Sequence, residues 1–155
     1  MSWAASGVFT LHIVCTGNLC RSPIAAALFR SRLPADRCRV LASGLAAQPG
    51  RSIDACAVQV LQAHGLHALE PVARAFLPAS VGPEDLVLVM QRRHLRALRA
   101  LVPAARARTH LLGRWGSPKD IDDPVGGTRE DFERAYAVIE RCVSEWCARE
   151  PRLAD

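Results

Sequence analysis

Apolar residues recur along the chain in two patterns, which predict short buried strands separated by helices. The runs 8–14 and 85–90 are almost continuously apolar, and the second suits a parallel strand covered on both faces. Shorter apolar segments at 39–42 and 109–112 predict two further strands. His12 is the one strongly polar residue of the first run. The sequence therefore predicts a sheet of four strands.

Apolar residues at helical spacing follow each of these runs. Ser22-Pro23 indicates a helix start, because Ser is a favoured N-cap and Pro is tolerated at the first helical position. Ser52 is expected to cap the next helix, and Thr128 opens a capping box before the last one. The predicted helices span 22–33, 53–64, 92–102 (burying Leu95, Leu98, Leu101 and Val102) and 128 to about 150, before Pro151.

The alternation of strands and helices defines the expected fold class. It is a three-layer, doubly wound α/β fold, with a four-stranded parallel sheet flanked by helices. We expect residues 1–155 to form a single domain. Ligands of such folds bind at the carboxyl ends of the strands. The residues that follow the first strand are therefore the first candidates for a functional site.

The segment 14–23, Val-Cys-Thr-Gly-Asn-Leu-Cys-Arg-Ser-Pro, joins the first strand to the first helix. Backbone N–H groups before a helix N-terminus converge on one point, where the helix dipole also favours negative charge. Gly17 permits a positive φ or a close backbone approach. Arg21 adds a planar fork suited to phosphate oxygens. The loop is therefore expected to bind a tetrahedral oxyanion.

Cys15 ends the strand facing that same point, and the surrounding groups stabilise its thiolate. A thiolate beneath a bound phosphate is placed for in-line attack on phosphorus. The segment is not a Walker A loop, which ends in Gly-Lys-Ser/Thr. In a simpler interpretation, Cys15 is a buried strand-end residue, Arg21 a solvated charge and Ser22 only a cap. The combined spacing favours the oxyanion loop.

Composition narrows the classes of partner. The net charge of +5 suits acidic or phosphorylated partners. Arginines cluster between 92 and 108 without interleaved aromatic residues, which favours a solvated helix face over a nucleic-acid site. No apolar stretch approaches the roughly 18 residues of a membrane span. The segment 1–10 lacks a signal-peptide layout, so we expect a cytoplasmic protein without membrane insertion.

The six cysteines are expected to be free thiols, because a chain of this length and apolar content does not need a disulfide framework. No Cys-x-x-Cys or Cys/His cluster has zinc spacing, so neither a metal nor a cofactor is expected. Cys20 lies in the same loop as Cys15, and the two thiols could form a reversible disulfide that protects the nucleophile. Cys20 is equally well interpreted as a small buried apolar residue.

The contiguous motif from Cys15 to Pro23 resembles the signature of the low-molecular-weight protein tyrosine phosphatase family, and the similarity runs over nearly the whole chain. The resemblance implies a phosphotyrosine phosphatase I-like fold and hydrolysis through a phospho-cysteine on Cys15, with Arg21 binding the phosphate. It also implies phosphate-binding or supporting roles for Thr16, Gly17, Asn18, Leu19, Cys20, Ser22 and Ser43.

A leaving phenolate has a conjugate acid with a pKa near 10, so a positioned general acid should accelerate its departure. Asp122-Asp123-Pro124 follows the last predicted strand on a Gly- and Pro-rich loop at the same edge of the sheet. The family places its acid in an Asp-Pro step, which corresponds to Asp123. This residue is expected to protonate the leaving oxygen and then to activate water. Alternatively, Asp122 and Asp123 are turn residues, since Asp-Pro steps initiate turns.

The chain departs from the family pattern beside the second helix. Pro71 stands where the family has a histidine that supports Asn18, and neither His64 nor His67 obviously substitutes for it. The sequence therefore leaves open what holds Asn18 in place.

A second departure concerns the pocket wall. Val125-Gly126-Gly127 replaces the aromatic residue that many members carry after the acid. This resembles a branch that acts on phosphoarginine, although that branch has Thr where this chain has Leu19, and a Leu wall favours an aromatic ring. Trp115 is either a substitute pocket aromatic or a packed loop residue.

The segments 93–96, 112–115 and 128–146 resemble a bacterial branch paired with exopolysaccharide and capsule export, whose members dephosphorylate a tyrosine autokinase. The expected function is hydrolysis of phosphotyrosine in proteins, with such an autokinase as a candidate partner. The alternatives are a protein-arginine phosphatase on the same fold, a thiol-dependent arsenate reductase and a non-catalytic phosphoprotein-binding module. The reductase needs two further closely spaced cysteines, which are missing between Cys56 and Cys142; a binding module would not need Asp123.

Overall fold

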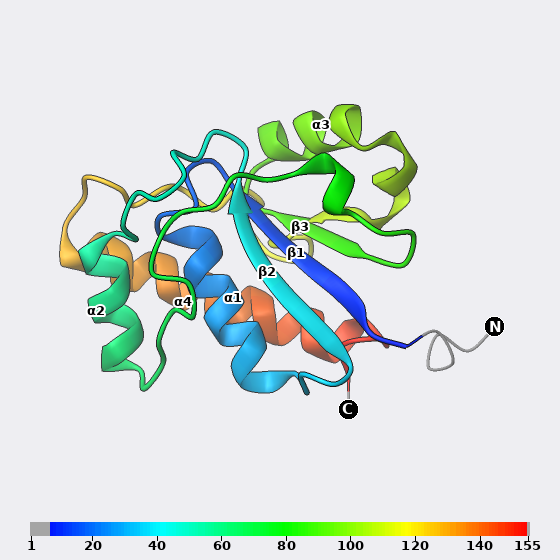
Figure 1. Cartoon of the computed structure of the whole chain (residues 1–155). Helices are drawn as coiled ribbons and strands as arrows, with labels where there is room; N and C mark the ends of the chain where they lie inside the picture. Colours follow the sequence, from blue (N-terminus) through cyan, green and yellow to red (C-terminus); the bar gives the residue numbers. More distant parts are fainter. Residues whose placement is uncertain (1–6, 155) are drawn as a thin grey trace.

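A central sheet of four strands organises the computed structural model, which describes residues 7–154. The strand order is β2-β1-β3-β4, and all three neighbouring pairs are parallel, as predicted (Figure 1). The carboxyl ends of the strands therefore meet at one edge, with the end of β1 between those of β2 and β3. The strands are β1 (Phe9–Cys15), β2 (Cys38–Gly44), β3 (Leu86–Val89) and β4 (Thr109–Leu111).

Helices cover both faces of this sheet and complete the three layers expected of a doubly wound fold. Three of them pack together on one face and the fourth lies on the other (Figure 1). Two short 3₁₀ helices, η2 (Pro78–Ser80) and η3 (Pro103–Arg108), lie on either side of β3 and α3 in the chain. The first face carries α1 (Arg21–Arg32), α2 (Ala55–Ala63) and α4 (Arg129–Arg149), and the second carries α3 (Arg92–Leu101).

The alternation of side chains along the strands builds a separate core on each face. Leu11 and Ile13 of β1 belong to the larger core, which includes the fully buried Phe29 and Trp146 of the flanking helices. On the other face, Val89 packs in the smaller core that includes Leu98 of α3. Both cores immobilise β1, so that the residue at its carboxyl end has a fixed position.

A buried polar pair explains the polar residue of the first strand. His12 is 2% exposed, and its Nε2 lies 2.9 Å from Asp85 Oδ2. The Asp85 carboxylate also accepts from the backbone N–H groups of Thr10, at 2.9 Å, and Gly82, at 2.7 Å. Although burial raises the pKa of the Asp85 carboxyl, the hydrogen bonds from Gly82, His12 and Thr10 hold it below its ordinary value. Asp85 therefore ties β1 to the turn before β3, far from the site.

Two predicted helix caps are wrong. The first helix begins at Arg21 with Cys20 as its N-cap residue, because the Ser22 hydroxyl is engaged inside the preceding loop. The second is capped by Asp54, whose Oδ1 accepts from the Cys56 N–H at 2.8 Å. Ser52 instead forms an isolated antiparallel bridge with Val72.

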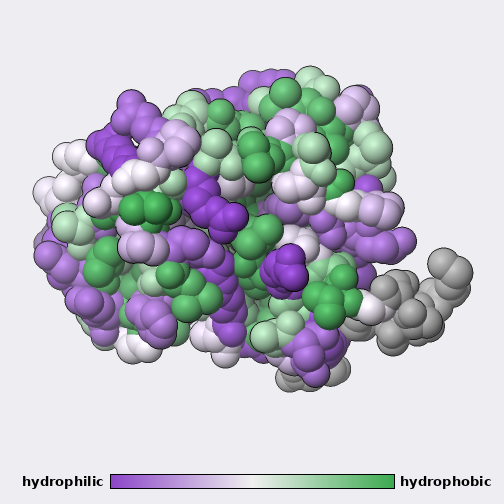
Figure 2. All heavy atoms as spheres, viewed as in Figure 1, coloured by the Kyte–Doolittle hydropathy of each residue, from purple (hydrophilic) through white to green (hydrophobic). Residues whose placement is uncertain are grey.

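The predicted apolar face of α3 is only partly correct. Leu98 is buried, whereas Leu101 is 52% exposed, because the helix ends there and the chain turns into η3. On the face shown in Figure 2, hydrophilic residues lie between groups of hydrophobic ones, several of which gather over α3. Within residues 7–154, no helix has the length and apolar character needed to cross a membrane. The sequence prediction for segment 1–10 falls mostly outside the described residues.

Candidate active site

The loop between β1 and α1 is held in a shape that the sequence predicted only in part. Cys15 and Arg21, at its two ends, are 2% and 1% exposed. The sequence allowed Gly17 either a positive φ or a close backbone approach; the positive φ of the loop, 56°, belongs instead to Asn18, in a region that Asn tolerates better than most residues. The Asn18 N–H consequently points back and donates to Cys15 Sγ at 3.3 Å. The backbone thus wraps around the thiol.

Side chains inside the loop brace that conformation. Asn18 Nδ2 donates to Ser22 Oγ at 2.7 Å, and Asn18 Oδ1 accepts from the backbone N–H of Arg74 at 2.8 Å. The Ser22 hydroxyl lies 3.0 Å from Cys15 Sγ and 3.4 Å from the carbonyl oxygen of Ser43. Asn18 is therefore supported although Pro71 stands where the family has histidine. Ser43 contacts the loop through its backbone carbonyl.

The loop rests on the end of β2, where a residue that sequence reasoning missed is essential. A Cβ on Gly44 would lie 2.5 Å from the carbonyl oxygen of Thr16 and 2.9 Å from the nitrogen of Asn18. These contacts are with backbone atoms and cannot be relieved by a side-chain rotation. The N–H of Leu45 also donates to the carbonyl of Cys15 at 2.9 Å. Only glycine fits beneath the loop, and the pair Ser43-Gly44 after a predicted strand was the available signal.

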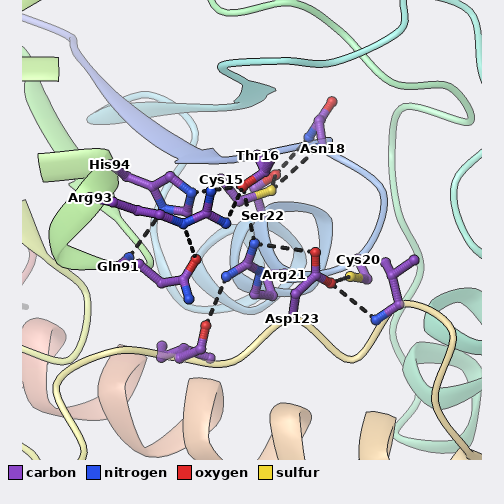
Figure 3. Close-up of polar contacts among 12 residues, drawn as sticks. Cys15, Thr16, Asn18, Cys20, Arg21, Ser22, Gln91, Arg93, His94 and Asp123 are labelled. Atoms are coloured by element: carbon purple, nitrogen blue, oxygen red, sulfur yellow. Dashed lines mark hydrogen bonds and ion pairs between the residues drawn. The ribbon is translucent and has the colours of Figure 1, made fainter. Parts of the chain in front are cut away.

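Asp123 reaches the same point from the segment after β4 (Figure 3). Its Oδ2 lies 3.4 Å from Arg21 Nη2, and its Oδ1 accepts from the thiol of Cys20 at 3.3 Å. Arg21 Nη1 donates to the carbonyl of Ile121 at 2.8 Å, which fixes the guanidinium. Burial, followed by the nearby Asp123 carboxylate, raises the pKa of the Cys20 thiol far above its ordinary value. The thiol is thus a neutral donor to the Asp123 carboxylate.

Arg21 also has unused hydrogen-bonding capacity. Its Nε is buried and has no hydrogen-bond partner within the described part of the chain. A buried N–H of a charged group without a partner is unfavourable, and an oxyanion in front of the loop would satisfy it. The donor geometry of the site therefore fits a phosphate group.

Two residues at the start of α3 contact the loop and were not predicted to belong to the site. His94 Nε2 lies 2.8 Å from Thr16 Oγ1, and Arg93 Nη2 donates to the same oxygen at 3.1 Å (Figure 3). Burial, together with the charges of Arg21 and Arg93, lowers the pKa of His94 to about 4. His94 therefore stays neutral at neutral pH. The sequence had placed Arg93 on a solvated helix face and the segment 93–96 in a family resemblance, and neither predicted a contact with the loop.

Cys15, Arg21 and Asp123 lie around a hollow of about 210 Å³. The connection 112–128 between β4 and α4, which carries Asp123, forms the acid loop, and its Val125 lines the hollow. Trp115 does not line it, because its indole packs 4.6 Å from that of Trp146 on the larger core. A second hollow of about 340 Å³ shares Asp123 and Val125 and extends along α4. The first hollow is lined by Cys15, Thr16, Gly17, Leu19, Cys20, Arg21, Ala46, Gln48, Arg51, Asp123 and Val125.

A thiol contacted by a backbone N–H and a hydroxyl of its own loop, a buried arginine and a carboxylate in one hollow define a cysteine-dependent phosphatase type of site. Comparison with known proteins agrees with this class. The family model described as low molecular weight phosphotyrosine protein phosphatase matches residues 10–152. The chain belongs to that family.

Individual relatives are similar along most of their length. The chain is 38% identical over 141 residues to the low molecular weight protein-tyrosine-phosphatase Etp of Escherichia coli K12, covering 90% of this chain and 93% of Etp. The crystal structure of the Erwinia amylovora tyrosine phosphatase AmsI superimposes with a TM-score of 0.83 at 33% identity, covering 90% and 91% of the two chains. The YwlE arginine phosphatase of Geobacillus stearothermophilus superimposes with a TM-score of 0.79 at 28% identity, covering 91% and 92%.

Proposed function

We propose that the protein hydrolyses phosphotyrosine in proteins through a phospho-cysteine intermediate. The observation that carries this proposal is the placement of Cys15, Arg21 and Asp123 around one hollow at the carboxyl ends of the strands. The first of these would be the nucleophile, the second the phosphate ligand and the third the general acid and base. The family and the relatives named as tyrosine phosphatases support the same activity.

The reaction proceeds in two displacements. In the first, the Cys15 thiolate attacks phosphorus while loop N–H groups and Arg21 hold the phosphate oxygens, and the leaving tyrosine oxygen takes a proton from Asp123. In the second, the Asp123 carboxylate takes a proton from a water molecule, and the resulting hydroxide attacks phosphorus and releases the thiolate and inorganic phosphate. Asn18 and Ser22 keep the sulfur oriented through both steps, since both contact Cys15 Sγ.

Replacing the thiol tests this mechanism directly. Cys15→Ser should lower the kcat for p-nitrophenyl phosphate by more than about 10³-fold, because a hydroxyl is a far poorer nucleophile at neutral pH. Cys56→Ser, at a half-buried thiol outside the hollow, is the matched control and should retain activity. Vanadate should inhibit the wild type competitively. Retention of turnover in Cys15→Ser would contradict the proposal.

Phosphoarginine is a second candidate substrate, favoured by the pocket wall. The acid loop offers Val125 where an aromatic ring would be expected to stack on tyrosine, and an arginine phosphatase is among the structural neighbours. Leu19 also lines the hollow and favours the aromatic substrate. Rates on matched phosphotyrosine, phosphoarginine and phosphoserine peptides would separate these candidates. A Leu19→Thr variant should shift the ratio towards phosphoarginine if this position selects the substrate.

We also infer a physiological role from the sequence resemblance. The protein would act in the cytoplasm on a tyrosine autokinase of polysaccharide export. Incubation of such a phosphorylated kinase with the wild type and with Cys15→Ser, followed by phosphotyrosine blotting, tests this role. Loss of kinase phosphotyrosine with the wild type, together with a Cys15→Ser variant that binds the phosphorylated kinase without dephosphorylating it, would support the pairing. A kinase whose phosphotyrosine signal the wild type leaves unchanged would contradict it.

A further inference from the structure

Arg93 is an exposed cation beside the active-site hollow, held against one of the residues that line it. Its Nη2 donates to Thr16 Oγ1 at 3.1 Å, and its Nε donates to Gln91 Oε1 at 3.1 Å. Thr16 itself lines the hollow. Figure 3 shows the guanidinium lying alongside His94 and directed towards the loop. A charge held by two hydrogen bonds loses less side-chain entropy on binding a ligand than a free arginine would.

His94 helps to determine which hydrogen-bonding groups surround Thr16 on this side of the hollow. Its Nδ1 accepts from the backbone N–H of Gln91 at 3.2 Å, so the ring proton lies on Nε2 and is donated to Thr16 Oγ1. Thr16 Oγ1 therefore accepts from His94 and from Arg93, and Arg21 Nη2 lies 3.5 Å from the same oxygen, so that donors surround it. This side of the hollow therefore offers hydrogen-bond donors and positive charge. His94 is 2% exposed and cannot itself contact a substrate.

Arg51 adds a second exposed cation from a different segment, the connection between β2 and α2. It lines the hollow beside Gln48. Its backbone is anchored, because its N–H donates to the Gln48 carbonyl and its carbonyl accepts from the Ala73 N–H, at 3.1 and 2.7 Å. The side chain therefore projects from a fixed point on the rim.

Arginine side chains outnumber carboxylates around the hollow. Asp123 is the one carboxylate among the residues that line the hollow, and it contacts the buried Arg21. Within residues 7–154, neither Arg51 nor Arg93 has a carboxylate at ion-pair distance, whereas their neighbour Arg92 pairs with Asp120. One exposed cation, Arg51, thus lines the hollow, and a second, Arg93, contacts its lining residue Thr16, so that both lie beside the space in which a phosphotyrosine would bind.

We propose that Arg51 and Arg93 select protein substrates in which acidic residues flank the phosphotyrosine. This inference rests on the proposed phosphatase function and specifies its substrate class. The two arginines would attract carboxylates next to the phosphorylated residue, in addition to the phosphate held by Arg21. Because the pairs form at an exposed rim, salt should weaken them.

A pair of phosphotyrosine peptides, identical except for Glu or Gln on both sides of the phosphorylated residue, tests the proposal. The wild type should show a kcat/KM about tenfold higher for the Glu peptide at low salt, with the preference falling towards one near 0.5 M salt. Arg51→Gln and Arg93→Gln should each reduce the preference about threefold, and the double variant should abolish it.

Arg96→Gln is the matched control, because this arginine is exposed on the same helix one turn further on and loses the same charge. It should leave the preference between the two peptides as in the wild type. Equal preferences in all the variants, or a wild-type preference of one, would overturn the proposal. Turnover of p-nitrophenyl phosphate is measured in parallel: its absence would refute the proposed phosphatase function, whereas its presence without discrimination between peptides refutes only the role of the two arginines.

Discussion

Two aspartates lie at opposite ends of the sheet, and the structure holds them differently. Asp85, just before β3, has a side chain that is 11% exposed and accepts hydrogen bonds of 2.7, 2.9 and 2.9 Å. Asp123, after β4, has a side chain that is 38% exposed, and its contacts with the Val125 N–H, Cys20 and Arg21 are 3.1, 3.3 and 3.4 Å long. Each carboxylate has three partners, yet only the second remains open to solvent.

The difference distinguishes a structural carboxylate, Asp85, which holds secondary-structure elements together, from Asp123, which is suited to proton transfer. Short hydrogen bonds from backbone N–H groups fix the Asp85 oxygens and favour the charged form, so a proton is difficult to place there. The longer contacts of Asp123 can be exchanged for a leaving oxygen or for water. Burial and bond length therefore distinguish the two roles better than residue type does.

Among the changes that test this comparison of the two aspartates, loss of the Asp123 carboxyl should have the largest effect. Asp123→Asn should lower kcat for phenyl phosphate by about 10²–10⁴-fold, because the phenolate then leaves without a proton. With an activated leaving group such as dinitrophenolate the loss should be much smaller. Asp122→Asn, at the adjacent exposed carboxylate, is the control and should behave as wild type. Equal losses for both leaving groups would make Asp123 a structural residue.

Loss of the Asp85 carboxylate should show the reverse behaviour. Asp85→Asn should lower the free energy of unfolding by about 1–3 kcal/mol, because charged hydrogen bonds to Thr10, Gly82 and His12 are weakened. The kcat of the folded variant should stay close to that of the wild type. Urea denaturation and turnover measured on the same sample check both expectations. A loss of kcat as large as that of Asp123→Asn would contradict a purely structural role for Asp85.

The pH dependence of stability should sharpen the contrast. The pKa of Asp85 is depressed in the folded protein, so its contribution to stability is complete above the unfolded pKa of about 3.9 and is lost as the pH falls through the folded value. The difference in unfolding free energy between the wild type and Asp85→Asn should be constant above about pH 5 and shrink below pH 4. A difference in unfolding free energy that grows on acidification would contradict a depressed pKa of Asp85 in the folded protein.

The smallest effect is expected at Cys20, whose thiol donates to Asp123 Oδ1. Cys20→Ala removes one hydrogen bond from a neutral thiol to the Asp123 carboxylate and should change kcat by about two- to tenfold. The same variant tests the predicted disulfide between Cys15 and Cys20, which are both free thiols in the structure. After brief peroxide treatment, dithiothreitol should restore the activity of the wild type but not that of Cys20→Ala. Equal recovery would argue against the disulfide.

The sequence predicted the fold and the first half of the site because both depend on local patterns. The parallel order follows from alternating strands and helices, and the Cys15 to Ser22 segment carries its chemistry within eight consecutive residues. The position of the segment Asp122-Asp123-Pro124 was predictable because it follows the last strand, whereas the choice of Asp123 as the acid rested on the family resemblance and stays a prediction. The role of Ser22 as a helix cap was wrong, since the hydroxyl has closer partners in Asn18 and Cys15.

Tertiary placement decided the remaining features. Gly44, Arg93 and His94 come from segments that the chain order separates from Thr16, and only the sheet brings them to the loop. The backbone N–H of Arg74 supports Asn18, and a backbone donor leaves no residue-type signal in the sequence. Trp115 packs on Trp146 because the larger core extends to the start of the acid loop.

This indole pair gives the molecule an optical reporter. Trp115 lies between β4 and Asp123 in the chain, whereas Trp146 is anchored in α4 by a hydrogen bond from its Nε1 to the Leu112 carbonyl at 2.8 Å. A movement of the acid loop that separates the rings would change their mutual quenching and the emission maximum. In a Trp3→Phe background these two rings supply all the tryptophan fluorescence of the chain. Loop motion during turnover could then be followed by stopped-flow measurements without an added label.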